Sequence, residues 1–156
     1  MSKHLYSVLL VDDSPDDRLF MRRAIEASPS LILEAELDDG EAVIDYLSAQ
    51  GRYQSRANLP LPDVLLLDLK LPRKTGHEVL EWLQKQSFSN LFVAVVSGSF
   101  LAEDISRSLE LGAQAYFKKR PGREELVAIV KAITTLLEHD PARETGGSAG
   151  SGNPGN

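Results

Sequence analysis

Short apolar runs alternate along the chain with longer amphipathic stretches. The runs are too short for helices, and several stop abruptly at a polar residue, which is typical of strands buried inside a sheet. Residues 31–37 differ, because apolar and acidic positions alternate there as in a strand with one solvated side. The pattern predicts five strands, at residues 7–11, 31–37, 64–67, 92–96 and 115–117.

The stretches between these runs carry apolar residues at helical spacing. Ser14 is placed to cap a helix that has Pro15 in its first position and acids in its first turn. Gly112 is a favourable C-terminal stop for a later helix. The segment 51–62 is polar, contains two prolines and is predicted to be a loop. The predicted helices span residues 15–27, 42–47, 79–83, 102–111 and 123–138.

Strands and helices that alternate in this way require crossover connections. They predict an α/β fold with a mostly parallel sheet covered by helices on both faces. A chain of 156 residues has the size of one domain. Residues 145–156 are nearly all Gly, Ser, Ala, Asn and Pro, and they cannot bury enough apolar surface to fold. We therefore expect one domain at 1–140 and a flexible tail at 141–156.

Composition excludes several classes of protein. The chain has no cysteine, so it has no disulfide, thiolate nucleophile or cysteine-ligated metal, which fits a reducing compartment. No apolar run is long enough to cross a bilayer, and the N-terminus lacks a signal-peptide pattern. The net charge of −6 argues against nucleic-acid binding, and three histidines argue against a histidine-rich metal site. We expect a cytoplasmic protein that binds neither nucleic acid nor membranes.

Polar residues that follow the predicted strands indicate a site. In folds of this kind the binding crevice lies beyond the carboxyl ends of the strands. Asp12 and Asp13 follow the first strand and Asp68 the third, whereas Ser97 and Lys119 follow the fourth and fifth. We therefore expect these five residues to gather at one edge of the sheet.

The chemistry of these residues points to phosphoryl transfer. Carboxylates held close together repel one another and raise each other's pKa unless a positive charge lies among them. Mg²⁺ suits such a cluster, because it binds carboxylates together with phosphate and water. Lys119 adds a charge suited to a phosphate oxygen, Ser97 adds a hydroxyl, and one carboxylate can act as the nucleophile.

Single acids have a simpler interpretation. An aspartate after a strand is usually a helix cap or a turn residue. Asp16 and Asp17 are interpreted as ordinary first-turn charges of a helix. Most of the remaining aspartates are placed in turns or on solvated surfaces, namely Asp38, Asp39, Asp45 and Asp63. Only the joint placement of acids, hydroxyl and lysine after separate strands favours a site.

Four motifs, in this order and spacing, resemble the receiver domain of two-component response regulators. They are the acidic pair after residues 8–11, the segment 62–72 with Gly76, the run 95–98 and the run 112–119. The resemblance covers residues 7–138 and implies a flavodoxin-like receiver fold with strand order 2-1-3-4-5. Spacing from Gly112 selects Lys119 rather than Lys118 as the family's lysine.

The resemblance also implies roles for individual residues. Asp68 corresponds to the phosphorylated residue, and Asp12, Asp13, Asp68 and the main-chain carbonyl of Lys70 to the ligands of Mg²⁺. Ser97 and Lys119 correspond to the groups that contact the phosphoryl group, and Ser97 and Tyr116 to the switch pair. Arg120 stands where the family usually has proline, which leaves open whether the Lys119–Arg120 peptide is cis.

The implied function is that of a stand-alone phosphorylation switch rather than an enzyme with a separate substrate. A sensor histidine kinase would phosphorylate Asp68, and segment 51–62 is similar to a subgroup that works with phytochrome-type kinases. Output would pass through a homodimer on the surface of the fourth helix, fifth strand and fifth helix, a downstream protein or a histidine phosphotransfer partner.

Two other classes stay as alternatives. A Mg²⁺-dependent phosphatase with an aspartate nucleophile would need a second aspartate two residues after Asp68, where this chain has Lys70. A flavin binder of similar architecture would need a glycine- and hydroxyl-rich phosphate loop after the first strand, where Asp12 and Asp13 stand instead.

Overall fold

The computed structural model describes residues 4–120 and 122–140. Its five strands are parallel and follow the predicted order, β2-β1-β3-β4-β5. The strands are β1 (Tyr6–Val11), β2 (Leu31–Leu37), β3 (Val64–Leu67), β4 (Phe92–Ser97) and β5 (Ala115–Lys118). The helices are α1 (Pro15–Glu26), α2 (Gly40–Ser48), α3 (Gly76–Gln84), α4 (Ala102–Glu110) and α5 (Arg123–Glu138). The predicted flexible tail, 141–156, lies outside the described residues.

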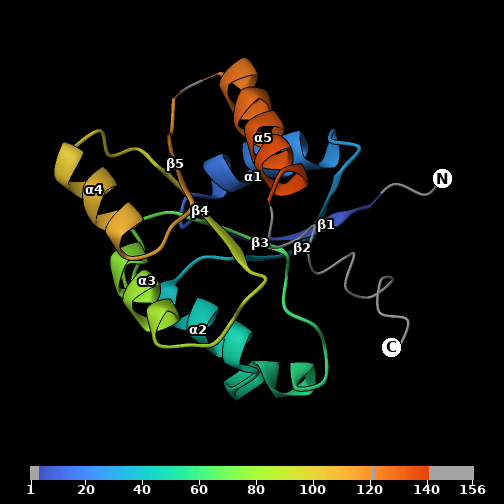
Figure 1. Ribbon diagram of the computed structural model, residues 1–156, viewed down its shortest axis with the longest axis vertical. Helices are drawn as coiled ribbons and strands as arrows, with labels where there is room; N and C mark the ends of the chain where they lie inside the picture. Colours follow the sequence, from blue (N-terminus) through green and yellow to red (C-terminus); the bar gives the residue numbers. More distant parts are fainter. Residues whose placement is uncertain (1–3, 121, 141–156) are drawn as a thin grey trace, which may run out of the picture.

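The two faces of the sheet are covered by different helices (Figure 1). Along β1, Val8 and Leu10 pack into one core with residues of α1 and α5, whereas Leu9 and Val11 pack into the other with residues of α2 and α3. Because both faces are buried, residues 8–11, 64–67 and 92–96 are continuously apolar. β2 lies at one edge of the sheet, and its alternating burial confirms the predicted solvated side.

The start of α1 agrees with the sequence prediction. Ser14 caps the helix by accepting a hydrogen bond from the N–H of Asp17 at 3.2 Å, and Pro15 occupies the first turn. This cap turns the chain from the end of β1 directly into α1. The first turn of α1 therefore stands at the carboxyl edge of the sheet.

The interpretation of segment 51–62 as a loop was wrong for its first half, which forms a 3₁₀ helix, η1 (Gly51–Arg56). Arg56 explains the difference, because its guanidinium lies 3.9 Å from the centre of the Tyr46 ring and 3.3 Å from a carboxylate oxygen of Glu34. The Tyr46 hydroxyl also donates a hydrogen bond to Glu34. Tyr53 adds an edge contact to the Tyr46 ring, so side chains rather than backbone pattern hold η1 against β2 and α2.

Among the described residues, no helix is both long and apolar enough to cross a membrane.

Candidate functional site

Strand pairing brings the predicted site residues to one edge of the sheet. Asp12 follows β1 and Asp68 follows β3, and the N–H of Asp68 donates a hydrogen bond to the carbonyl of Val11 at 3.1 Å. On the other side of β3, the N–H of Lys119 donates to the carbonyl of Ser97 at 2.7 Å. These backbone bonds set the spacing of the side chains, as the crossover topology predicts.

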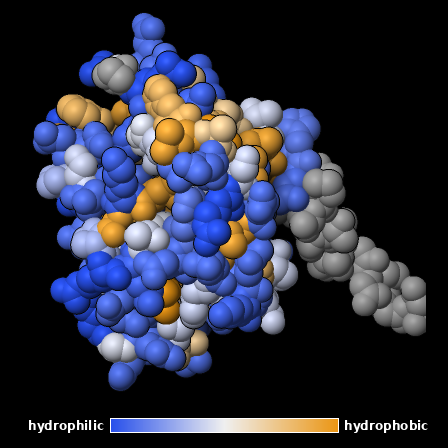
Figure 2. All heavy atoms as spheres, turned by 90° about the vertical axis from the view of Figure 1, so that its left-hand side faces the viewer, coloured by the Kyte–Doolittle hydropathy of each residue, from blue (hydrophilic) through white to orange (hydrophobic). Residues whose placement is uncertain are grey.

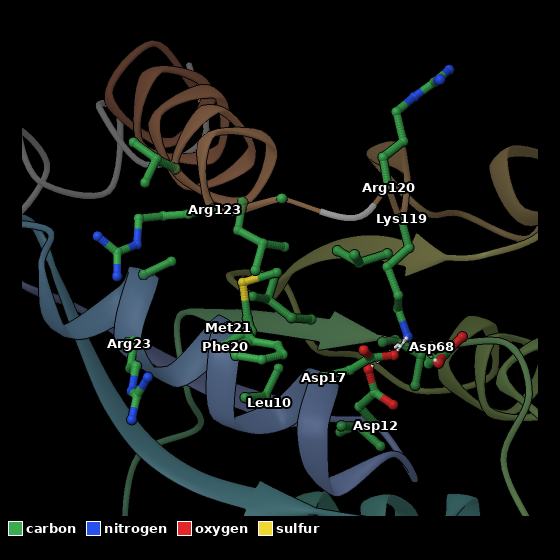
Figure 3. Close-up of a pocket in the computed structure, with 18 of the residues that line it drawn as sticks. Leu10, Asp12, Asp17, Phe20, Met21, Arg23, Asp68, Lys119, Arg120 and Arg123 are labelled. Atoms are coloured by element: carbon green, nitrogen blue, oxygen red, sulfur yellow. Dashed lines mark hydrogen bonds and ion pairs between the residues drawn. The ribbon is translucent and has the colours of Figure 1, made fainter.

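The ammonium group of Lys119 lies at the centre of the site (Figure 3). Its Nζ is 2.7 Å from Oδ2 of Asp12, 2.8 Å from Oδ2 of Asp68 and 3.0 Å from Oδ2 of Asp17. Asp12 and Asp68 are buried, whereas Lys119 and Asp17 are partly exposed. A single ammonium thus holds three carboxylates that would otherwise repel one another.

Backbone groups fix the two buried aspartates further. Oδ1 of Asp12 accepts the N–H of Ser14 at 2.9 Å, and Oδ1 of Asp68 accepts the N–H of Leu69 at 2.7 Å. The guanidinium of Arg18 donates to the main-chain carbonyl of Asp12 at 2.6 Å. Both carboxylates are therefore held in place on the backbone side as well as by Lys119.

Burial and hydrogen bonding have opposite effects on the pKa values of Asp12 and Lys119. Burial raises the pKa of Asp12, and the hydrogen bonds from Lys119 and from the Ser14 N–H offset only part of this effect. Burial also lowers the pKa of Lys119, but its hydrogen bonds to Asp12 and Asp68 outweigh that effect and raise the pKa above its ordinary value. Lys119 is therefore charged across the physiological pH range.

Three carboxylates of the site are arranged as ligands for a cation. Asp12, Asp13 and Asp68 each offer an oxygen, and these oxygens all lie within 4.8 Å of one another. Oxygen donors of this kind suit hard divalent ions such as Mg²⁺ or Mn²⁺. Asp13 is exposed and is not among the partners of Lys119, so the group has an open, negatively charged side. The donor set therefore fits a divalent cation.

Gly76 packs directly against the backbone of Asp68 and Leu69. A Cβ atom at this position would lie 2.4 Å from the carbonyl oxygen of Asp68 and 2.7 Å from Cα of Leu69. The N–H of Gly76 donates to the carbonyl of Leu69 at 2.9 Å. α3 therefore begins in direct contact with the backbone of Asp68, and only glycine permits this approach.

Ser97 and Tyr116 lie near this edge, but their hydroxyl groups form hydrogen bonds with Ser99 rather than with Lys119 or its carboxylate partners. Ser97 is buried, and its hydroxyl accepts the N–H of Ser99 at 3.2 Å. The Tyr116 hydroxyl donates to the carbonyl of Ser99 at 2.8 Å. Lys70 contributes its N–H to Oδ1 of Asp68 at 3.4 Å, while its side chain is exposed. Among residues 4–120 and 122–140 no peptide bond is cis, so Lys119–Arg120 is trans.

The interpretation of Asp17 as an ordinary first-turn charge was wrong. Asp17 lies in the first turn of α1, which Ser14 and Pro15 start directly at the sheet edge. Its carboxylate consequently reaches Lys119, which comes from the far end of the sheet order. No local signal identifies it, because its sequence context is that of an ordinary first-turn acid. Asp16, by contrast, is exposed and belongs to neither the metal group nor the Lys119 contacts.

Comparison with known proteins agrees with this geometry. Residues 8–131 match the response regulator receiver domain family. The response regulator Rcp1 of Synechocystis is 35% identical over 133 residues, which cover 83% of this chain and 86% of Rcp1. The crystal structure of Mn²⁺-bound Rcp1 superposes with a TM-score of 0.74 at 31% identity, over 86% of this chain and 96% of Rcp1.

A second solved structure has the same fold. The phosphorylated cyanobacterial phytochrome response regulator RcpA superposes with a TM-score of 0.73 at 30% identity, over 86% of this chain and 95% of RcpA. The family supports signalling through a phosphoacceptor and not the phosphatase alternative. Binding of a divalent metal at the acidic cluster is supported by the Mn²⁺-bound relative and by the three carboxylates. The chain therefore belongs to the response regulator receiver domain family of two-component signalling proteins.

Proposed function

We propose that Asp68 is the phosphoacceptor of this receiver domain and that a sensor histidine kinase supplies the phosphoryl group. One observation carries the proposal: the buried carboxylate of Asp68 is 2.8 Å from Lys119 Nζ and shares a cation-ligand group with Asp12 and Asp13. The Leu69 N–H holds Oδ1, so the carboxylate is already oriented before it attacks phosphorus. The bond from phosphorus to the kinase histidine breaks as the bond to Asp68 forms.

We assign Mg²⁺ to the group of Asp12, Asp13 and Asp68, with the main-chain carbonyl of Lys70 as a further ligand. A bound divalent cation would neutralise negative charge on the transferring phosphoryl oxygens. Asp12 and Asp68 are positioned for this by backbone N–H groups and by Lys119. Asp13 is exposed, so its carboxylate is open to an entering ion.

Lys119 and Ser97 recognise the phosphoryl group in this proposal. A phosphoryl group on Asp68 would place new anionic oxygens beside Lys119 Nζ, which would then exchange its contacts with Asp12 and Asp17 for contacts with the phosphoryl oxygens. Ser97 Oγ would leave the Ser99 N–H to contact the same group. The main-chain carbonyl of Ser99 also accepts a hydrogen bond from the Tyr116 hydroxyl, so this movement would change the position of Tyr116.

Output would pass through protein contacts on the surface of α4, β5 and α5. Phe100, Leu101 and Leu109 are large apolar side chains that are about half exposed beside or in α4. Figure 2 shows this side of the molecule, where apolar patches interrupt a mostly hydrophilic surface. A homodimer, a downstream protein or a histidine phosphotransfer partner could cover this surface. Sedimentation with and without beryllofluoride separates the first from the other two, because only a dimer changes the mass of the isolated protein.

The donor kinase is of the phytochrome type in this proposal. Its support is the similarity to RcpA, a phytochrome response regulator, across most of both chains. A cytoplasmic location is part of the same proposal and agrees with a chain free of cysteine. Incubation with a phosphorylated phytochrome kinase should transfer the phosphoryl group within seconds to minutes, and faster than transfer from an unrelated kinase. Equal rates from both kinases would contradict the phytochrome assignment.

To test the phosphoacceptor, three proteins are incubated with acetyl phosphate and Mg²⁺, and their intact masses are measured by mass spectrometry. The unmodified protein and Asp16→Asn should each gain one acid-labile phosphoryl group. Asp68→Asn should gain none, because the amide lacks the nucleophilic oxygen anion. Asp16 is the matched control, because it is an exposed aspartate at the same edge. Stoichiometric labelling of Asp68→Asn would assign the acceptor to another residue.

A further inference from the structure

A cavity of about 720 Å³ lies between α1 and α5 (Figure 3). Its floor is formed by the strands, through Leu10, Leu66 and Val96, and its walls include Met21 of α1 and Leu126 of α5. This volume falls within the range of roughly 300–1,000 Å³ that is common for small-molecule sites. Asp13 and Lys70 do not line the cavity, whereas Asp12 and Asp68 do, so one end of the cavity adjoins the proposed metal site.

Small side chains on α1 explain why the space is not filled. Ala24 of α1 and Ala27, which caps the C-terminus of α1, lie about one turn apart, and both line the cavity. Phe20, one turn earlier, is 50% exposed although it also lines the cavity. Covering an exposed aromatic ring with an apolar molecule is favourable, because apolar surface is removed from water. The cavity therefore has unfilled apolar volume next to a ring that is only half covered.

The charges around the cavity are separated along its length. Its three acidic lining residues, Asp12, Asp17 and Asp68, are all bound by Lys119 Nζ. In Figure 3 the guanidinium groups of Arg23 and Arg123 lie at the opposite end of the cavity from Asp68. Within residues 4–120 and 122–140, neither arginine forms an ion pair. One end is thus acidic and already paired, whereas the other has two cations without a carboxylate.

We infer that this cavity binds a small amphiphile with an apolar body and one anionic group, of the fatty-acid or arylsulfonate class. The anion lies between Arg23 on α1 and Arg123 on α5, where two guanidinium groups can donate charge-assisted hydrogen bonds. The apolar body covers Met21, Leu126 and the ring of Phe20. The reverse orientation is opposed by repulsion from the three carboxylates that share Lys119 at the other end.

Binding is measured by calorimetry on the full chain without phosphorylation, with decanoate as ligand and decanol as the neutral comparison. The unmodified protein should bind decanoate at one saturable site. Arg23→Gln combined with Arg123→Gln should lower the affinity for decanoate at least about tenfold and leave that for decanol unchanged. Arg107→Gln is the matched control, because it removes an exposed arginine of α4 that does not line the cavity.

A second variant tests the cavity itself. Ala24→Leu should fill space next to Met21 and abolish binding of both decanoate and decanol. Equal decanoate affinity in the unmodified protein and the double arginine variant would overturn the inference, as would absent or non-saturable binding to the unmodified protein. Folding of each variant is checked by circular dichroism, and the arginine variant decides the question if Ala24→Leu fails to fold. Decanoate binding is measured on the unphosphorylated chain without Mg²⁺, so its outcome is distinguishable from that of the phosphoacceptor test.

Discussion

The phenol hydroxyl of Tyr116 donates a hydrogen bond to the main-chain carbonyl of Ser99 over 2.8 Å. Ser99 in turn donates its N–H to the hydroxyl of Ser97 and its own hydroxyl to the carboxylate of Asp104 in α4. A strand-end serine at the proposed phosphoryl site is thereby connected to both α4 and β5. Any movement of Ser97 has to be accommodated by Ser99, which is the shared partner.

Removal of the Tyr116 hydroxyl should destabilise the protein modestly. Tyr116→Phe leaves the Ser99 carbonyl without this donor, and we expect the free energy of unfolding to fall by about 1 kcal/mol in urea titrations. Tyr53→Phe is the control, because the Tyr53 hydroxyl forms no hydrogen bond with any residue of 4–120 or 122–140. Equal losses in the two variants would mean that the Tyr116–Ser99 bond contributes nothing.

Loss of the Lys119 charge should make stability depend on a divalent cation. Lys119→Met leaves Asp12, Asp17 and Asp68 without their shared ammonium, and we expect a loss of about 2 kcal/mol in EDTA. This is less than the ~3–5 kcal/mol of a fully buried pair, because Lys119 is partly exposed. Mg²⁺ should restore more stability to the variant than to the unmodified protein, since the cation replaces the missing charge.

Urea unfolding in EDTA and in excess MgCl₂ measures this effect. Lys118→Met is the control, because Lys118 is exposed and contacts the ring of Phe100 rather than a carboxylate. We expect Lys118→Met to unfold like the unmodified protein in both solutions. The same response to Mg²⁺ in both lysine variants would contradict the central position of Lys119.

Asp13 should matter for metal affinity rather than for folding. Asp13→Asn replaces an exposed carboxylate ligand by a neutral amide, and we expect Mg²⁺ affinity to fall about tenfold or more, which corresponds to ~1.4 kcal/mol. Calorimetric titration with MgCl₂ measures the change. Asp16→Asn removes the same charge three residues away and should alter the affinity much less. If both variants weaken binding equally, general electrostatic attraction rather than coordination explains the effect of Asp13.

Tyr46 should make the fold sensitive to alkaline pH. Burial, followed by the hydrogen bond to Glu34, raises the pKa of Tyr46 above its ordinary value. The unfolded chain then loses the phenol proton near pH ~10 while the folded chain keeps it. Stability from this group is therefore complete below that pH and is lost as pH rises above it, by about 1.4 kcal/mol at one unit above.

The experiment compares unfolding free energies at about pH 9 and about pH 11, on either side of the ordinary tyrosine pKa. The unmodified protein and Tyr53→Phe should lose more stability between these values than Tyr46→Phe does. Other groups titrate over the same range, but they are common to all three proteins. An identical loss in Tyr46→Phe would show that the phenol ionises equally readily in the folded and unfolded chains.

Gly76 should tolerate no side chain. Gly76→Ala would place Cβ 2.4 Å from the carbonyl of Asp68, and we expect a loss of about 1–3 kcal/mol together with slower phosphorylation by acetyl phosphate. Gly98→Ala is the matched control, because a Cβ there meets nothing within 4 Å. We expect Gly98→Ala to have nearly normal stability. Normal phosphorylation of Gly76→Ala would show that the backbone of Asp68 can shift without consequence.

Local patterns in the sequence predicted most of the fold. Apolar runs such as residues 64–67 are recognisable because a strand buried on both faces needs apolar residues at every position. The cap formed by Ser14 and Pro15 is equally local, because both residues act on their own helix. The predicted edge site follows from these assignments, since parallel strands place Asp12 and Asp68 together.

Segment 51–62 and Asp17 could not be assigned in the same way. The helix η1 depends on contacts of Arg56 with Tyr46 and Glu34, which belong to α2 and β2. The mostly polar sequence of this segment, with its two prolines, carries no periodic signal for such contacts. Asp17 has the ordinary sequence context of a first-turn acid, and only the position of Lys119 gives it a second role.

The sequence by itself determined the strands and the start of α1, because each depends on residues close together in the chain. The covered sheet and its acidic edge then follow from the alternation of strands and helices. Tertiary structure decided which acids share Lys119, how η1 is held, and that a cavity lies between α1 and α5. Those features depend on side chains from elements far apart in the sequence. Distances between such side chains are set by packing, and packing has no periodic pattern along the chain.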